Sequence, residues 1–184
     1  ASAGIQFVAS DGLRNAVFVA LQDKRIVGFD EKNKKELFAV DIPCSSDILG
    51  MHCMPELDSI VITCTDGTLL LLNMDEQSFE PVGDLEGGIL CSSVSPDGEL
   101  LLCLTATGTM IVFNSEWDVL VEKELGAGER PAGDRPTVAW CADGLKFALL
   151  DTRASGKRFV SVFDRNCVLE AKSEDFEGVG SGLA

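Results

Sequence analysis

The sequence predicts an all-β fold in which a unit of four short strands repeats about every 40 residues. Short apolar runs alternate with turn motifs, the turns recur at a nearly constant spacing, and almost no segment has helical periodicity. The stretch VSPDGELLLCLTATGTMIVFN, residues 94–114, shows the pattern. Its PDG segment (96–98) is a tight turn, because proline presets φ, aspartate bonds its own backbone and glycine allows positive φ. Residues 100–104 and 110–113 are predicted strands of a β-hairpin.

The same order of turn, apolar run, small turn and apolar run occurs four times along the chain. Each hairpin ends on a polar residue, and these closing residues are 43, 41 and 50 residues apart: Asp30, Asn73, Asn114 and Asp164. Glycines of the small turns give a second marker with spacings of 41 and 48 residues: Gly67, Gly108 and Gly156. A further short run follows each hairpin and another precedes three of them, which indicates four strands per repeat.

A period of about 40–45 residues with four strands per unit is typical of a WD-type β-propeller. One four-stranded sheet cannot cover both of its apolar faces, whereas blades stacked around an axis cover each other. We therefore expect the chain to be part of one all-β propeller domain: blades at 1–43, 44–88, 89–131 and 136–177, and the first strand of a fifth at 178–184. A β-sandwich is the alternative, but it needs no such repeat and its strands should alternate polar with apolar residues. Just over four units indicates a fragment of a larger propeller.

Composition excludes several classes of function. The chain is 46% hydrophobic, and no apolar run approaches the ~18 residues of a transmembrane helix. The first ten residues lack the charged start and apolar core of a signal peptide. The net charge of −15 makes this segment a poor candidate for a main nucleic-acid contact, because phosphates repel an acidic surface. One basic cluster, EKNKKE, places Lys32, Lys34 and Lys35 in a predicted loop, either as ordinary solvated residues or as a contact for an acidic partner.

Residues that could carry out chemistry are sparse. Seven cysteines include no C-x-x-C motif and no zinc spacing, which favours buried, reduced thiols in an intracellular protein. The single histidine, His52, precedes Cys53 on a predicted strand, where neighbouring side chains point to opposite faces. The GVGSG segment (178–182) lacks the strand-turn-helix context of a phosphate loop. We therefore expect no catalytic residue, no metal site and no cofactor, and we interpret the chain as a non-enzyme.

Several motifs resemble a known family. An SPD turn follows a serine-rich strand, the segment from Ser115 to Leu120 contains Trp117, and the RPTVAWCADGLKFALL stretch brings Arg135-Pro136 before a strand that ends at Trp140. The segment from Val162 to Arg165 and a glycine-rich end at 178–183 continue the pattern. In these motifs the chain is similar to the N-terminal propeller of the scaffolding (largest) subunit of the Elongator complex. The short connection between 125 and 137 and the Lys24-Arg25 turn depart from the family pattern.

The resemblance implies a non-catalytic scaffold that positions partner subunits for modification of the tRNA wobble uridine. The implied partners are a catalytic subunit, of radical S-adenosylmethionine and acetyltransferase-like type, and a second WD-repeat subunit. Contacts with tRNA are expected mainly outside this segment, and membrane contact is not expected. The implied location is the cytoplasm, with the nucleus as a second site. Candidate partner contacts are the loops that carry Lys32, Lys34, Lys35 and Trp117.

Two alternatives remain open from the sequence. The first is a WD-repeat platform of another intracellular assembly, of the vesicle-coat or ribosome-biogenesis type, which differs only in the identity of the partner. The second is an enzyme that guides substrate into the central channel of the propeller. The predicted inner strands offer only His52, cysteines and serines for such chemistry, which argues against an enzyme.

Overall fold

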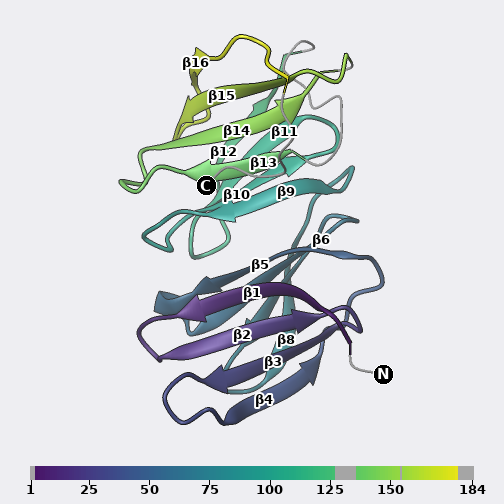
Figure 1. Ribbon diagram of the computed structural model, residues 1–184, viewed down its shortest axis with the longest axis vertical. Coiled ribbons are helices and arrows are strands. Elements are labelled where there is room, and N and C mark those ends of the chain that lie inside the picture. Colours follow the sequence, from purple (N-terminus) through teal and green to yellow (C-terminus); the bar gives the residue numbers. More distant parts are fainter. Residues whose placement is uncertain (1–2, 127–135, 154, 178–184) are drawn as a thin grey trace. The chain divides into compact units, whose positions relative to one another are not determined.

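The computed structural model describes residues 3–126, 136–153 and 155–177. Four antiparallel sheets of four strands each form the described part of the chain, and in every sheet the strands follow one another in sequence order (Figure 1). One sheet lies within each of the ranges 1–43, 44–88, 89–131 and 136–177. The expected first strand of a fifth blade, at 178–184, lies outside the described residues.

The chain divides into two compact units, Ala1–Leu85 and Glu86–Ala184, and each contains two sheets. In unit 1 the first sheet consists of β1 (Ile5–Asp11), β2 (Ala16–Leu21), β3 (Arg25–Asp30) and β4 (Glu36–Asp41). The second sheet of unit 1 consists of β5 (Ile48–Met54), β6 (Ser59–Cys64), β7 (Thr68–Asn73) and β8 (Ser78–Asp84), with the short 3-10 helix η1 (Pro55–Leu57) between β5 and β6.

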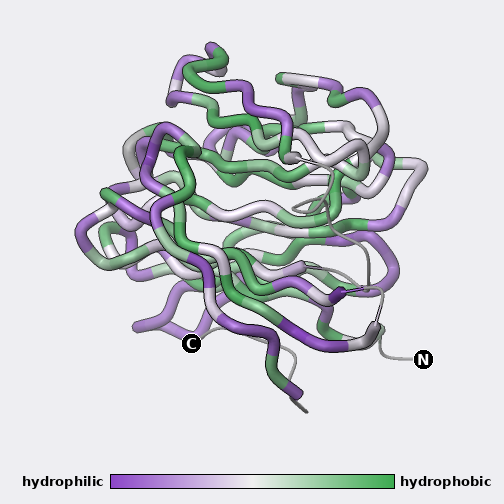
Figure 2. The backbone as a smooth tube through the Cα atoms, turned by 90° about the horizontal axis from the view of Figure 1, so that it is seen from above, coloured by the Kyte–Doolittle hydropathy of each residue, from purple (hydrophilic) through white to green (hydrophobic). Residues whose placement is uncertain are grey.

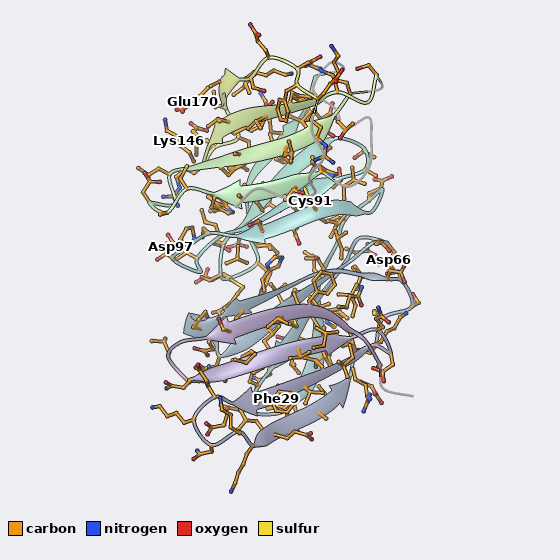
Figure 3. The ribbon with its side chains drawn as sticks, viewed as in Figure 1. Phe29, Asp66, Cys91, Asp97, Lys146 and Glu170 are labelled. Carbon is orange, nitrogen blue, oxygen red and sulfur yellow. The ribbon has the colours of Figure 1, made fainter. Side chains whose placement is uncertain are left out.

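Unit 2 repeats this arrangement. Its first sheet consists of β9 (Ile89–Val94), β10 (Leu101–Thr105), β11 (Thr109–Phe113) and β12 (Val119–Glu124). Its second sheet consists of β13 (Thr137–Trp140), β14 (Lys146–Thr152), β15 (Arg158–Asp164) and β16 (Leu169–Lys172). On this sheet Lys146 of β14 and Glu170 of β16 form an ion pair of 2.5 Å (Figure 3).

Middle strands are buried on both faces, as the uninterrupted apolar runs predict. Every residue of β6 (SIVITC) and of β10 (LLCLT) is buried. The last strands of the sheets are mostly exposed, and β12 and β16 contain no fully buried residue. In Figure 2 the hydrophobic stretches lie mainly along strands and the hydrophilic ones mainly at the connecting turns.

Each unit has one core, built from alternate residues of its two sheets. In unit 1, Phe18 of β2 and Ile26 of β3 share a cluster with Ile60 and Ile62 of β6. In unit 2, Leu102 of β10 shares a cluster with residues of β14 and β15, where the rings of Phe147 and Phe163 stack at 5.4 Å. Each sheet therefore buries at least one apolar face against its neighbour.

The first strands of the two sheets in a unit approach each other most closely. β1 lies beside β5 in unit 1, and β9 lies beside β13 in unit 2. A side-chain hydrogen bond joins each pair of strands: Gln6 Nε2 donates to the Ile48 carbonyl at 3.1 Å, and Trp140 Nε1 donates to the Ser93 carbonyl at 3.3 Å. A sandwich would bring middle strands face to face, whereas approach at the first strands is the geometry of neighbouring propeller blades.

Small turns between the second and third strands share one backbone conformation. Gly67, Gly108 and Gly156 have positive φ, and each donates its N–H to the carbonyl three residues earlier. The first sheet has Lys24 at this place, with φ of 63° and the same hydrogen bond to Leu21. The first repeat thus keeps the turn geometry without the glycine that marks it elsewhere.

These turns allow a stability prediction with a matched control. A Cβ added at Gly67 would lie 2.1 Å from the Leu85 carbonyl oxygen, whereas one added at Gly156 would meet nothing within 4 Å. Gly67→Ala should therefore lower the free energy of unfolding by about 3 kcal/mol or more, from backbone strain and overpacking together. Gly156→Ala should lower it by only about 1 kcal/mol, from strain alone. Equal losses in chemical denaturation would contradict the close backbone approach at Gly67.

Candidate functional site

The closing polar residues of the repeat are turn caps. In the first sheet Asp30 Oδ1 accepts the backbone N–H groups of Lys32 and Asn33, both at 2.8 Å. In the third sheet Asn114 Oδ1 accepts those of Glu116 and Asp118 at 3.0 and 2.8 Å. Each turn also contains one non-glycine residue with positive φ: Lys34, Gln77, Trp117 and Cys167. Because aspartate and asparagine bond the backbone two residues ahead, they fix the turns between third and fourth strands.

The turn of the first sheet presents the predicted basic cluster. Lys32, Lys34 and Lys35 are all exposed, and Lys34 has a φ of 55°. Asn33 supports the turn because its backbone and side-chain N–H groups both bond Asp30, which lowers the pKa of that carboxyl. The structure thus places three ammonium groups on one hydrogen-bonded turn, an arrangement that can attract acidic groups of a partner.

The turn of the third sheet presents an aromatic residue in an unfavourable backbone conformation. Trp117 is half-buried with φ of 68°, and its N–H bonds the Asn114 carbonyl at 3.1 Å. A bulky residue rarely adopts positive φ, because its Cβ then crowds the backbone. Val119 and Leu120 follow with 53% and 54% of their surfaces exposed. We name Trp117, Val119 and Leu120 the Trp117 patch.

The two candidate surfaces belong to different units. The lysine turn lies in unit 1 and the Trp117 patch in unit 2. Acidic side chains flank the Trp117 patch on both sides in the sequence, at Glu116, Asp118 and Glu122, and all three are exposed or partly exposed. The patch therefore suits a partner segment that combines apolar and basic residues.

Sequence reasoning missed an ion network that joins the two sheets of unit 1. Asp11 is only 1% exposed and accepts the backbone N–H groups of Leu13 and Arg14 at 2.8 and 3.1 Å. The Arg14 guanidinium contacts Asp11 Oδ2 at 3.2 Å and also pairs with Asp58, in the turn before β6. Arg14 thus bridges the buried carboxylate of Asp11 and the exposed carboxylate of Asp58, which lie 47 positions apart in the sequence. No local sequence motif predicts such a contact.

Unit 2 contains a buried carboxyl group that the sequence did not single out. Asp151 of β14 is 2% exposed, its Oδ1 accepts the Thr152 N–H at 2.6 Å, and its Oδ2 has no hydrogen-bond partner among the described residues. Burial raises the pKa of Asp151, and burial together with the Asp151 charge raises the pKa of Cys91 (Figure 3) to about 12. Both shifts favour the uncharged forms, as expected in an apolar core.

The pKa values of His52 and Cys53 are also shifted in favour of the uncharged form. Burial lowers the pKa of His52 to about 4 and raises the pKa of Cys53 to about 11, so both side chains are neutral near pH 7. All seven cysteines are free thiols, as predicted, but only four are buried: Cys44 and Cys53 are partly exposed and Cys141 is exposed. Within the described residues no cluster of three or more histidine, cysteine or acidic side chains could hold a metal ion. No helix in the described ranges is long and apolar enough to span a membrane.

The sequence also did not predict that Arg153 and Lys172 lie over the ring of Phe159 in the fourth sheet. The Arg153 guanidinium lies 4.0 Å from the centre of the Phe159 ring, and Lys172 Nζ lies 4.7 Å from it. Arg153 also bonds Asp175 at 3.1 Å. The two cations lie over the Phe159 ring, a structural role that the spacing of the residues along the chain does not reveal.

Comparisons with known proteins agree with this geometry. A family model described as the ELP1 first N-terminal beta-propeller matches residues 2–132. Elongator complex protein 1 of Rattus norvegicus is 26% identical over 178 residues, which is 76% of this chain and 13% of the relative. Elongator complex protein 1 of Arabidopsis thaliana is 32% identical over 128 residues, which is 62% of this chain and 10% of the relative. The chain therefore spans only a small part of the curated relatives.

A solved structure shows the fold independently. The crystal structure of the WD40 domain of Toxoplasma gondii coronin aligns over 100% of this chain and 50% of that chain, with a TM-score of 0.74 and 15% identity. At this identity the likeness concerns the fold alone, and it confirms the partial WD-type β-propeller. The match of residues 2–132 confirms the resemblance that the motifs indicate, and the chain belongs to the family of first N-terminal propellers of ELP1, the Elongator complex protein 1 family.

Proposed function

We propose that this chain is a non-catalytic scaffold propeller of an Elongator complex, and that it positions other protein subunits for modification of the tRNA wobble uridine. The observation that supports the proposal most directly is the match of residues 2–132 to the ELP1 propeller family. The relatives carry the name of an Elongator complex protein, which favours assembly with other subunits. The cytoplasm, with the nucleus as a second site, is the proposed location.

The distribution of ionisable groups supports a binding role rather than a catalytic one. General acid–base catalysis works best when the pKa of the acting group lies near the working pH. The pKa values of His52, Cys53 and Cys91 are instead moved to about 4, 11 and 12 by burial. Such groups contribute to a packed core, so the surface of the propeller is where function is expected.

The capped turns supply suitable contact surfaces. The backbones of the lysine turn and of the Trp117 patch are held by side-chain caps, so the turns themselves have little backbone freedom left to lose on binding. Tryptophan is enriched at the centres of protein interfaces, and exposed charges increase the rate of association. We assign the lysine turn to an acidic partner surface and the Trp117 patch to an apolar, basic one.

One prediction separates the binding of protein subunits from the binding of tRNA. The tagged 184-residue chain should bind at least one purified Elongator protein subunit. Its dissociation constant for tRNA should be larger than about 10⁻⁴ M at ~0.15 M salt, because its acidic surface repels phosphate. Titration by fluorescence anisotropy over a series of salt concentrations measures the tRNA affinity. Tight and salt-sensitive tRNA binding without subunit binding would refute the scaffold role.

The Trp117 patch can be tested without loss of the fold. Trp117→Gly removes the ring and also relieves the positive φ, so the free energy of unfolding should stay within about 1 kcal/mol of the original chain. Binding of the subunit partner should weaken by about 10-fold or more, as for an interface aromatic residue. Gln77→Gly is the matched control, since Gln77 has the same place in its turn and a φ of 54°. Equal affinities for the two variants would rule out the Trp117 patch as a contact.

The lysine turn should act mainly on the rate of association. Lys34→Glu should slow binding of the subunit partner severalfold at low salt, with a smaller effect at high salt, because exposed charges steer encounter. Lys157→Glu makes the same charge change at an exposed residue of the β14–β15 turn and serves as the control. Association kinetics by biolayer interferometry provide the comparison. If both variants slowed association to the same extent, the total charge of the chain would control the rate, and the lysine turn would have no specific role in binding.

A further inference from the structure

One buried oxygen atom of unit 2 has no hydrogen-bond partner although two cations lie nearby. Asp151 of β14 is 2% exposed, and its Oδ2 atom is unpartnered among the described residues. Asp151 pairs across the sheet with Phe159 of β15, so the two side chains lie on the same face. The Arg153 guanidinium and Lys172 Nζ lie 4.0 and 4.7 Å from the centre of the Phe159 ring. Both cations thus contact the neighbour of the carboxyl group without bonding its second oxygen atom.

Arg153 is instead bound to an exposed carboxylate. Its Nε donates to Asp175 Oδ1 at 3.1 Å, in the exposed segment 173–177 that follows β16. Arg158 of β15 and Phe176 exchange two backbone hydrogen bonds of 2.9 and 2.8 Å, which hold this segment beside β15. The Arg153 guanidinium therefore has two acidic side chains in its surroundings, one exposed on the segment 173–177 and one buried on β14.

The surroundings of Asp151 favour its neutral form. Among the described residues, the charged or titratable groups that face it are Arg153 from the following turn, Lys172 from β16 and Cys91 from β9, while Asp175 acts through Arg153. Burial raises the pKa of the Cys91 thiol to about 12, so this thiol adds no charge near pH 7. Burial also raises the pKa of Asp151, and the Thr152 N–H and the two cations offset only part of that effect. A buried carboxylate with an unbonded oxygen atom is costly, so the folded chain retains the proton.

We propose that Asp151 is a proton-operated switch that determines which of two carboxyl groups holds Arg153. While Asp151 is protonated it carries no charge, and Arg153 stays on the Phe159 ring and on Asp175. When the pH rises, the proton leaves to solvent and a carboxylate remains in the apolar interior. Because charges attract more strongly there than in water, the guanidinium turns to Asp151 Oδ2, and the segment 173–177 loses its contact with Arg153. Asp151 and Arg153 are two positions apart, so a rotation of side chains is sufficient.

The same proton affects stability. The folded chain binds it more tightly than the unfolded chain, in which an aspartate has a pKa of about 3.9. Between that value and the raised pKa of the folded chain, stability falls as the pH rises. Relative to Asp151→Asn, the folding equilibrium constant of the original chain should fall by up to about 10-fold per pH unit in this interval and stay constant outside it. Chemical denaturation at a series of pH values measures this ratio, and a ratio independent of pH would overturn the proposal.

Asp97→Asn is the control for this measurement, at another carboxyl group of unit 2. A hydrogen bond from Ser95 lowers the pKa of Asp97. The folded chain therefore binds this proton less tightly than the unfolded chain does. Relative to Asp97→Asn, the original chain should gain stability as the pH rises, which is the opposite sign. A loss of the same sign and size for both variants would assign the effect to the total charge and contradict a specific role of Asp151.

Nuclear magnetic resonance tests the switch in the unsubstituted 184-residue chain. The carboxyl carbon-13 signal of Asp151, assigned by its loss in Asp151→Asn, reports the titration directly. We expect its midpoint above the ordinary aspartate value of about 3.9, and we expect the Arg153 Nε–Hε signal to shift with the same midpoint. In Asp151→Asn this shift of the Arg153 signal should be absent. A midpoint at or below about 3.9, or an Arg153 signal that does not follow Asp151, would refute the switch.

A pair of variants tests the competition for Arg153. Asp175→Asn removes the exposed carboxylate that binds the guanidinium, so Arg153 becomes available to Asp151 and the midpoint of Asp151 should fall by about 0.5 pH unit or more. Glu174→Gln is the matched control, because it removes one negative charge from the neighbouring position of the same exposed segment. It should shift the midpoint much less. Equal shifts in the two variants would show that Arg153 is not exchanged between the two carboxyl groups.

Discussion

The burial of both faces of a thin sheet is the constraint on which this structure depends. β6 and β10 are buried at every residue, so each needs apolar neighbours on two sides, and a four-stranded sheet cannot supply them to itself. Within a unit the solution is to share one core between two sheets, as Phe18 and Ile60 do in unit 1. Close approach of the first strands and short connections then follow, because the sheets must face each other while the chain passes from one to the next.

The turns follow from the same constraint. Strands of four to seven residues must reverse tightly, and positive φ at a fixed place in the turn is how the chain does so. Where the backbone of another segment approaches closely, only glycine fits, as at Gly67. The turns between third and fourth strands carry lysine, glutamine or tryptophan at a positive φ of 55°, 54° and 68°. The residue at this turn position can therefore differ between sheets and is available for contact with a partner. Trp117 has the largest side chain among these residues.

Local patterns and long-range contacts differ in how far the sequence predicts them. The hairpins around Gly67 and Gly108 follow from apolar runs and turn residues that lie next to each other in the chain, so a reader of the sequence can place them. The exposure of Lys34 follows in the same way from a polar segment. The bridge from Arg14 to Asp58 depends on how neighbouring sheets are placed, and no spacing of residues encodes that. Asp30 and Asn114 lie between these cases: their period is visible in the sequence, but their role as caps needs coordinates.

The separation between a neutral interior and a charged exterior explains why a propeller of this kind suits assembly. Inside, burial moves the pKa values of Asp151, Cys91 and His52 toward their uncharged forms, which removes the charges that would weaken the core. Outside, the acidic surface keeps the chain soluble and discourages contact with phosphate, while the turns add local exceptions: a basic one at the lysine turn and an apolar one at Trp117. For the proposed scaffold, such local exceptions would help to distinguish partners, because an acidic partner surface would meet like charge away from the lysine turn.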